Sequence, residues 1–433
     1  MSDGERSDAT EEPDLSPLAE RLAETGADGY LVYDDSEDSD QRYVSGFDAP
    51  DPFTTLFTRG GTHLLVSGLE YGRARSESRA DTVRRNSQFD YREKAAEYGA
   101  REAKHRVLAE FLGRVDPGPD PDPDSGGASA STGAGDGDGD AGGGVDSVLV
   151  PEGFPLGTAE GLREQGVTVD VETEGVVGEI RATKTDREVA HVREAQRANE
   201  AALRAAEELL REANVENGRL HHDGETLTSE RVKTVIETTL VEHGYALDDT
   251  IVACGADGAD PHDRGGGPLA PDEPVVIDVF PRSKATKYHA DMTRTFVVGE
   301  PTAEVRRRHE VTLEAMAAAY DVLDAGTAAG ITGAAVHDAV CDVYEDAGYD
   351  TFRSNPQAET GFIHSTGHGV GLDVHESPSV SPDGGELRPG NVVTVEPGLY
   401  DPAHGGLRVE DLVVVREGGY ENLTDYHTDL VLD

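Results

Sequence analysis

Five side chains that can bind metal ions lie in or beside apolar runs in the last third of the chain: Asp278, Asp291, His368, Glu396 and Glu410. A carboxylate buried without a partner costs several kcal/mol, so carboxylates in strand interiors are paired or bind a metal. Four carboxylates and one imidazole are about what two divalent cations need when some carboxylates bridge them. Such ions lower the pKa of a shared water toward neutrality. These residues therefore predict a hydrolytic site with two metal ions.

Taken singly, each of these residues has a plainer explanation. A lone Asp or Glu after a hydrophobic strand is more often the first residue of a turn. The presence of all five in order, with further histidines, favours the metal site. Glycines between residues 367 and 371 most simply allow tight backbone near a site, since no P-loop lysine pattern follows them. Four other histidines have no motif around them and are expected to be surface or structural residues: His289, His309, His337 and His404.

Hydrophobic periodicity predicts the elements that position these residues. Apolar runs predict strands before Asp278 and Glu396, and place Glu410 inside a further strand. Thr185 and Glu188 form a capping-box pattern that opens a long helix. The predicted helices of this part of the chain cover residues 188–214, 229–243, 302–325 and 333–347. The last two helices are each expected to end near a glycine.

Chain length predicts two domains, residues 15–175 and 176–433. In the first, the segments DGYLVYD, THLLVSG and DSVLVPEG predict buried strands. Helical stretches such as residues 91–115 separate these strands, and this alternation is typical of an α/β domain. Residues 1–14 are predicted to be a disordered acidic tail. Residues 116–145 are low-complexity and acidic, and predict a disordered loop.

The chain is strongly acidic, with 86 Asp and Glu against 38 Lys and Arg, only six lysines and a formal net charge of −48. Such a chain repels itself at low ionic strength. The acidity is spread over the folded-looking regions, which resembles proteins of a salt-accumulating cytoplasm. A polycation-binding protein would more usually concentrate its acid in one block. Phosphates would be repelled, so nucleic acid is not expected as a partner.

Cysteine usage and hydropathy indicate the compartment. Cys254 and Cys341 cannot build a disulfide framework in a chain of this length, which favours a reducing cytoplasm. The first residues, MSDGERSDATEEPD, are polar, and no apolar run approaches the length of about 18 residues that a membrane helix needs. Neither export nor membrane insertion is expected.

The motifs around the five residues resemble the pita-bread metallopeptidases, the family of Xaa-Pro aminopeptidases, prolidases and methionine aminopeptidases. VVIDVF with ADMTRTFVVG is similar to the family's paired-aspartate hairpin, HSTGHGVGLDVHE to its histidine segment, and VVTVEPGLY and GGLRVEDLVVV to its two glutamate strands. The resemblance spans roughly residues 260–420. It implies that Asp278 chelates one metal, that Asp291 and Glu410 bridge both, and that His368 and Glu396 hold the second.

The spacing of the two aspartates departs from that family. Asp278 and Asp291 are 13 residues apart, two more than is usual there. If the pair faces each other across a hairpin, two extra residues in the turn leave both side chains on one face. The geometry is therefore expected to be kept.

The resemblance also implies roles for four more residues. His262, in GADGADPHDRG, would contact substrate near the scissile amide, and His375, in DVHE, would hydrogen-bond the tetrahedral intermediate. His364 would lie at the mouth of the pocket, as in proline-directed members. Arg408 would orient substrate or a metal ligand. The chemistry of Glu396 suits a general base that then passes the proton to the leaving nitrogen as a general acid.

The implied fold is an α+β pita-bread catalytic domain, duplicated from two helices and a hairpin, after an α/β creatinase-type N-terminal domain. In that first domain RYVSGF is similar to a tyrosine-containing strand. The implied activity is a metal-dependent peptidase that cuts between an N-terminal residue and proline, either as a dipeptidase or as an aminopeptidase. Its expected partners are a peptide with proline second and a second copy of the chain. Mn²⁺ is the first choice of metal, with Co²⁺, Fe²⁺ or Zn²⁺ as alternatives.

Two other functions compete with this one. A methionine aminopeptidase is the simplest rival, and both the extra domain and His364 oppose it. A creatinase-like amidinohydrolase or a non-catalytic binding module is the other. Such members of the fold have lost metal ligands, whereas all five are present here.

Overall fold

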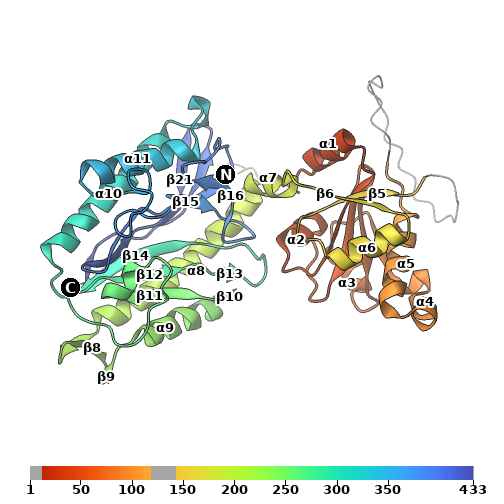
Figure 1. Cartoon of the computed structure of the whole chain (residues 1–433). Coiled ribbons are helices and arrows are strands. Elements are labelled where there is room, and N and C mark those ends of the chain that lie inside the picture. The colour runs from red at the N-terminus through yellow and green to blue at the C-terminus, as the bar shows by residue number, and fades with distance from the viewer. Residues whose placement is uncertain (1–11, 119–142, 433) are drawn as a thin grey trace, which may run out of the picture. The chain divides into compact units, whose positions relative to one another are not determined.

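A computed structural model describes residues 12–118 and 143–432, which include two compact units (Figure 1). One unit is Pro13–Ile180, and the other comprises the chain from Arg181 onward. Most of the predicted acidic tail, residues 1–14, and of the predicted loop, residues 116–145, lies outside the described residues. Within the described residues, no helix is long and apolar enough to cross a membrane.

The first unit is built on one mixed sheet in the order β4-β3-β2-β1-β5-β6. Strand β2 runs antiparallel to β1 and β3, and the other neighbours are parallel. The strands are β1 (Gly29–Asp34), β2 (Phe53–Thr58), β3 (Gly61–Val66), β4 (Thr82–Arg85), β5 (Ser147–Val150) and β6 (Thr168–Val171). The helices are α1 (Ser16–Thr25), α2 (Ser39–Ser45), α3 (Tyr71–Glu77), α4 (Tyr91–Tyr98), α5 (Ala100–Leu112), α6 (Leu156–Glu164) and α7 (Val176–Ala182), the last crossing into the second unit. The predicted buried strands are β1, β3 and β5, and the α/β class is confirmed.

Two details of this unit were predicted wrongly. The RYVS segment is helical, in α2, because the Asp38 side chain caps the helix by accepting a hydrogen bond from the backbone N of Gln41 at 2.7 Å. The single helix expected over residues 91–115 is two helices, α4 and α5. They are separated at Gly99, whose φ of +84° is one that other residues rarely adopt.

The second unit contains four long helices close to their predicted positions: α8 (Asp186–Arg211), α9 (Ser229–Glu242), α10 (Ala303–Asp324) and α11 (Gly333–Asp346). Each begins at a threonine whose hydroxyl accepts a backbone N–H of the first turn. At the start of α8 the predicted capping box of Thr185 and Glu188 is present. Gly326 and Gly348 follow the ends of α10 and α11 in positive-φ conformations, as expected.

These helices cover two sheets (Figure 1). The first sheet, in the order β11-β12-β14-β22, shares a hydrophobic core with α8 and α9. The second, in the order β16-β15-β17-β20-β21, shares a core with α10 and α11. Two helices and a sheet therefore occur twice, which is the expected duplicated pita-bread arrangement.

The strands of the two sheets are β11 (Thr250–Cys254), β12 (Val275–Val279), β14 (Met292–Val298), β22 (Val431–Leu432), β15 (Gly367–Gly369), β16 (Glu376–Val380), β17 (Val392–Val395), β20 (Asp411–Arg416) and β21 (Gly419–Asn422). Smaller ladders pair β7 (Asn214–Glu216), β8 (Arg219–His222) and β9 (Glu225–Thr226), β10 (Tyr245–Ala246) with β13 (Arg282–Ser283), and β18 (Gly398–Asp401) with β19 (Gly405–Arg408).

Candidate metal centre

The predicted ligands lie at corresponding places on the two sheets. Asp278 is within β12 and Asp291 directly precedes β14, while His368 is the middle residue of β15 and Glu396 directly follows β17. Glu410 was predicted to lie inside a strand, but it lies in the break between β19 and β20. Its backbone N donates to the carbonyl of Thr293 on β14 at 3.0 Å, so this short segment bonds across to the other sheet.

The register of β12 and β14 keeps the two aspartates on one face. Asp278 pairs with Thr293, and Asp291 lies two residues before Thr293. Side chains alternate along a strand, so all three point to the same side. The longer spacing was predicted to leave both side chains on one face. This prediction is confirmed, because the extra residues lie in the connection between β12 and β14.

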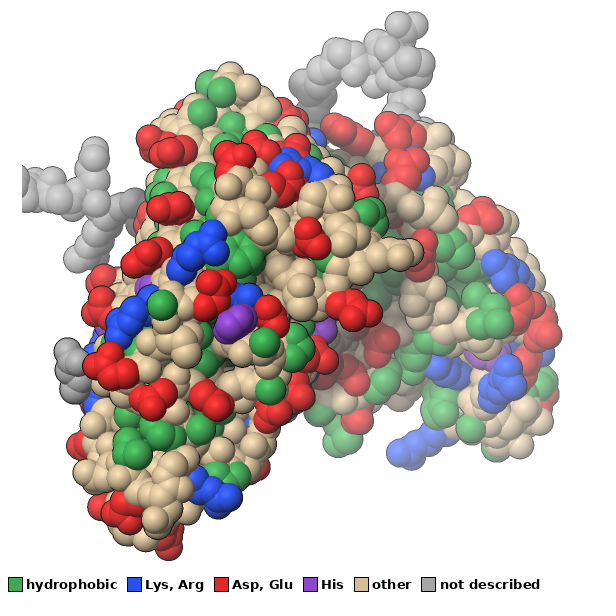
Figure 2. All heavy atoms as spheres, turned by 60° about the vertical axis from the view of Figure 1, so that its left-hand side comes forward, with side chains coloured by type: hydrophobic (Ala, Val, Ile, Leu, Met, Phe, Trp, Pro, Cys, Tyr) green, Lys and Arg blue, Asp and Glu red, His purple; other side chains and the backbone are tan. Residues whose placement is uncertain are grey.

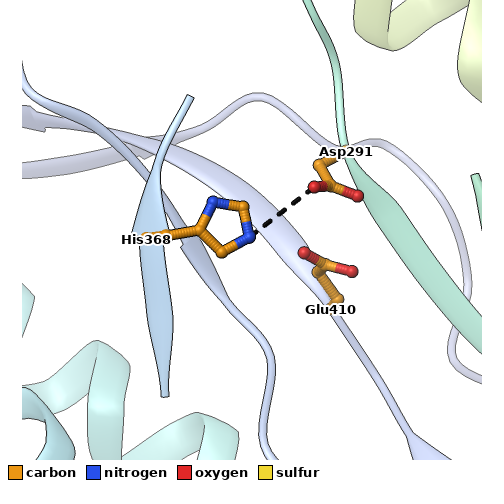
Figure 3. Close-up of side chains that lie close together, drawn as sticks. All are labelled: Asp291, His368 and Glu410. Carbon is orange, nitrogen blue, oxygen red and sulfur yellow. Dashed lines mark ion pairs between the residues drawn. The ribbon is translucent and has the colours of Figure 1, made fainter. Parts of the chain in front are cut away.

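Side chains from both sheets converge on one point (Figure 3). One ligand atom from each of Asp291, His368 and Glu410 lies within 4.8 Å of the others. The Nε2 atom of His368 is 3.7 Å from Oδ2 of Asp291 and 3.3 Å from Oε1 of Glu396. The carboxylates come together although their charges repel each other, which indicates a cation site.

The imidazole of His368 is oriented for a cation. Its Nδ1 faces the carbonyl oxygen of Gly369 at 3.2 Å, so the ring proton lies on Nδ1 and Nε2 is left as the electron-pair donor. Its backbone N donates to Oγ1 of Thr394 at 3.0 Å, and Thr394 Oγ1 donates to Glu396 at 3.2 Å. A Cβ atom on Gly367 would lie 2.0 Å from the carbonyl oxygen of Thr394, so glycine allows β15 to approach β17 this closely.

Arg408 holds the remaining carboxylate. Its Nη2 donates to Oδ2 of Asp278 at 2.7 Å, its Nη1 to the hydroxyl of Tyr400 at 2.8 Å and its Nε to Oγ1 of Thr293 at 3.1 Å. Thr293 in turn donates to Oε2 of Glu410 at 2.7 Å. Oδ1 of Asp278 is buried and has no hydrogen-bond partner among the described residues. A buried oxygen without a partner is costly, and a bound cation would satisfy it.

The electrostatics of the cluster also fit cations. Burial raises the pKa of Asp291 and Glu410 well above their usual range, and neighbouring carboxylates raise both further. Burial raises the pKa of Glu396 to about 7, against the opposing charge of Arg408. Four ionised carboxylates and one guanidinium carry a charge of −4 + 1 = −3. Without cations, the folded site retains protons to reduce this charge.

Metal binding should therefore stabilise the fold more as pH rises. Raised carboxyl pKa values mean that the metal-free folded protein binds more protons than the unfolded one, so these groups lower its stability as pH rises from about 4 toward and above 7. A divalent ion displaces those protons and removes the penalty. We expect the difference in Tm between metal-loaded and chelated protein to widen between pH 5 and pH 7.5 in calorimetry. A difference that is constant with pH would contradict this proton displacement.

The other predicted site residues lie around this cluster. His364 contacts the hydroxyl of Tyr400 through Nε2 at 3.0 Å, and burial lowers the pKa of His364 to about 3. The His375 ring lies 4.2 Å from that of His368, centroid to centroid. His262 lies in an exposed loop, and its charge acts on the pKa of Glu396.

Sequence reasoning missed three polar residues of the site: Thr293, Thr394 and Tyr400. The threonines lie two residues from Asp291 and Glu396, so strand alternation alone would place them on the ligand face. Tyr400 is fully buried and links Arg408 to His364. No local pattern marks Tyr400, because His364 is 36 residues away in the sequence and Arg408 lies on the neighbouring strand β19.

Comparisons with known proteins identify the family and the fold. Residues 190–417 match metallopeptidase family M24, and residues 15–111 match the creatinase/prolidase N-terminal domain. The Xaa-Pro dipeptidase of Pyrococcus horikoshii is 29% identical over 293 residues, covering 66% of this chain and 76% of the relative. The structure of a prolidase from Pyrococcus horikoshii superimposes with a TM-score of 0.72 at 25% identity, covering 96% of this chain and 99% of that one. An X-Pro aminopeptidase from Thermotoga maritima shares the fold, with a TM-score of 0.71 at 22% identity over 96% of this chain and 99% of that one.

The fold and the converging ligands define a metal-dependent hydrolase of the pita-bread type. The chain belongs to metallopeptidase family M24, whose match covers more than half of its length. It is thus a peptidase that uses divalent metal ions, with an N-terminal domain of the creatinase/prolidase type.

Proposed function

We propose that the protein is an Xaa-Pro peptidase that cleaves the bond between an N-terminal residue and proline. The convergence of Asp291, His368 and Glu410, with Glu396 and Asp278 beside them, is the observation that carries the proposal. The names of the relatives support the substrate class, because both a dipeptidase and structures of prolidases are among them. The family match and these names do not favour a methionine aminopeptidase. The complete ligand set opposes a binding module.

The charge of the site supports divalent ions, and the number of donors supports two of them. A charge of −3 from the ligands and Arg408 becomes −1 with one such ion and +1 with two, so either number brings it closer to zero. Four carboxylates and one imidazole suit two cations that share carboxylates. We propose that these five residues would hold the ions: Asp278 would serve one, His368 and Glu396 would serve the other, and Asp291 and Glu410 would be shared by both. Mn²⁺ is our choice because oxygen ligands predominate, with Co²⁺, Fe²⁺ or Zn²⁺ as alternatives.

When bound, the ions would supply an activated water and would polarise the scissile carbonyl. Glu396 takes the proton of the attacking water and delivers it to the leaving proline nitrogen. His375 donates a hydrogen bond to the developing oxyanion. His262 contacts the substrate near the scissile amide, and His364 lies at the mouth of the pocket. Arg408 keeps Asp278 in place through the 2.7 Å contact.

Replacing His375 by alanine should lower kcat without loss of metal. Removal of one donor to a developing oxyanion costs roughly 10²- to 10³-fold in kcat. We expect KM to change little, because the bond strengthens only in the transition state. Metal analysis of the purified variant beside steady-state kinetics tests this. A variant that has lost metal would make His375 a ligand instead.

Hydrolysis of an Xaa-Pro dipeptide and of an Xaa-Pro-Xaa tripeptide, with added Mn²⁺ and with a chelator, tests the function. Cleavage of the dipeptide alone defines a dipeptidase, and cleavage of the tripeptide an aminopeptidase. A non-proline dipeptide and a peptide with N-terminal methionine are the controls. If folded, metal-loaded protein cleaves only a control, the proposed substrate class is wrong.

We further propose that the protein is adapted to high salt and works in a cytoplasm as a homodimer. Figure 2 shows acidic side chains distributed over the face in view rather than gathered in one block. With a net charge of −48, salt should relieve repulsion within the folded chain. We expect Tm to rise as KCl increases from 0.1 M to 2 M, a range over which the Debye length falls from about 10 Å to below about 3 Å. A Tm that is independent of KCl would contradict the adaptation to high salt. The molar mass from light scattering in the same buffers tests the proposed homodimer.

A further inference from the structure

A buried ion cluster lies behind the connection between β15 and β16, which carries His375. Glu376 follows His375 directly, and its side chain is only 7% exposed. Its Oε2 atom is 2.7 Å from Nη2 of Arg181, and its Oε1 atom is 2.6 Å from Nζ of Lys184. Neither cation takes part in the metal centre described above. An ion pair this deeply buried is costly unless its geometry is well satisfied, and here each oxygen of the carboxylate contacts a cation.

The carboxylate of Glu376 fills the inside of this connection. The backbone N of Asp373 donates to Oε2 of Glu376 at 3.3 Å. A Cβ atom on Gly371 would lie 2.3 Å from Oε1, so the backbone there packs directly against the carboxylate. The carbonyl of Gly371 accepts a hydrogen bond from the backbone N of His289 at 2.8 Å. Residues 371–376 are thus held from both sides.

The two cations connect this turn to the helices. Arg181 lies in the last turn of α7, and its Nη2 also contacts Oδ2 of Asp373 at 2.5 Å. Lys184 lies just before α8 with a side chain that is 1% exposed, and its backbone N donates to the carbonyl of Gly390 at 3.0 Å. The charges therefore tie the turn to rigid elements.

His375 lies in the connection that these contacts hold. Its side chain is exposed, and among the described residues none hydrogen-bonds its ring. The described contact of that ring is the one with the ring of His368, at 4.2 Å between centroids. We propose that Glu376, Arg181 and Lys184 are positioning residues that fix His375 beside the metal centre. The proposal rests on the proposed function, in which His375 stabilises the reacting carbonyl oxygen.

The test is Glu376→Gln, which keeps the shape of the side chain and removes its charge. We expect kcat to fall about tenfold or more, as when residues that support an active-site group are changed. Metal content and KM should stay near the wild-type values. Glu207→Gln is the matched control, because Glu207 is also buried, with an 8% exposed side chain, and pairs with Arg211 at 2.7 Å and His427 at 2.8 Å. It should lose stability to a similar degree and retain kcat.

A double-mutant cycle separates positioning from general structure. In a His375→Ala background, Glu376→Gln should have no further effect on kcat, because the group it positions is absent. The same tenfold loss in that background would overturn the proposal. So would loss of metal in Glu376→Gln, or an unchanged kcat.

A second readout does not depend on peptide cleavage. In the zinc-loaded protein, NMR should show that the His375 imidazole shifts change in Glu376→Gln and in Lys184→Met but not in Glu207→Gln. If the wild-type protein cleaves no Xaa-Pro peptide, the proposed function fails while this measurement still decides the positioning role. Unchanged His375 shifts in both variants would overturn that role.

Discussion

Replacing Asp291 by asparagine should remove bound divalent metal and nearly all peptidase turnover. Asp291 is 4% exposed, and its carboxylate lies within 4.8 Å of ligand atoms from His368 and Glu410. An amide has the same shape but no charge, and it cannot bridge two cations as a carboxylate does. Changes to residues that only support metal ligands cost about 10- to 100-fold in affinity or activity. We expect more than about 100-fold from a bridging ligand, in both metal affinity and kcat/KM.

The same substitution should stabilise the metal-free protein. Burial and the charges of Glu410 and Asp278 raise the pKa of Asp291 well above its usual range, so an ionised Asp291 is costly when no cation is present. An amide removes that charge. We therefore expect the chelated variant to unfold at a higher temperature than chelated wild type at pH 7.5, while added metal stabilises only the wild type.

Metal analysis, thermal unfolding with and without chelator, and peptide hydrolysis test these expectations together. Asp338→Asn is the control for the loss of a charge, because Asp338 is exposed on α11. It should change none of the three measurements appreciably. Full metal content with retained activity in the Asp291 variant would contradict the bridging role. A lower Tm under chelation would mean that Asp291 serves the fold rather than the metal.

The parts of this structure that could be predicted are those governed by local rules. The helices of the second unit begin at threonine caps and end near glycines, and both features are visible in the sequence. The face shared by Asp278 and Asp291 follows from the period of a strand and needs no knowledge of the turn. The strands before Glu396 and around Asp278 are short, continuous runs rich in β-branched apolar residues, which predict buried strands.

The parts that could not be predicted depend on contacts between distant segments. The break that holds Glu410 exists because its backbone bonds to Thr293 and because the Arg294 guanidinium donates to its carbonyl at 2.6 Å. The hydrophobic pattern of the sequence continues across this break and therefore predicts one strand. In the first unit, β2 pairs with β3 through a short turn after Thr58, and its threonine-rich sequence lacks the alternation that marks a half-buried strand.

Arg408 illustrates how such contacts change an interpretation. The resemblance left open whether this residue orients substrate or a metal ligand. The structure places its guanidinium, in a residue that is 4% exposed, against Asp278, Thr293 and Tyr400. Its donor atoms point at protein side chains, which favours a role in holding the predicted metal ligand Asp278 in place.

Arg408→Met should therefore destabilise the metal-free protein strongly. Methionine fills a similar volume but leaves the buried carboxylate of Asp278 without its 2.7 Å partner. Removal of one member of a buried ion pair costs about 3–5 kcal/mol. The site charge would change from −3 to −4, and bound cations would compensate part of that loss. We expect a large fall in the free energy of unfolding in chelator, and a smaller one with metal.

Arg408→Lys separates charge from geometry. A lysine keeps the positive charge but cannot contact Asp278, Thr293 and Tyr400 together, because it lacks the planar fork of arginine. It should restore much of the stability in chelator while kcat/KM stays about 10- to 100-fold below wild type, as for other changes in residues that orient metal ligands. Urea unfolding with and without metal, beside peptide hydrolysis, measures both quantities. If the lysine variant matched wild type in activity, the charge alone would suffice. If the methionine variant were as stable as wild type in chelator, Asp278 would not need Arg408, and the residue would be free to bind substrate instead.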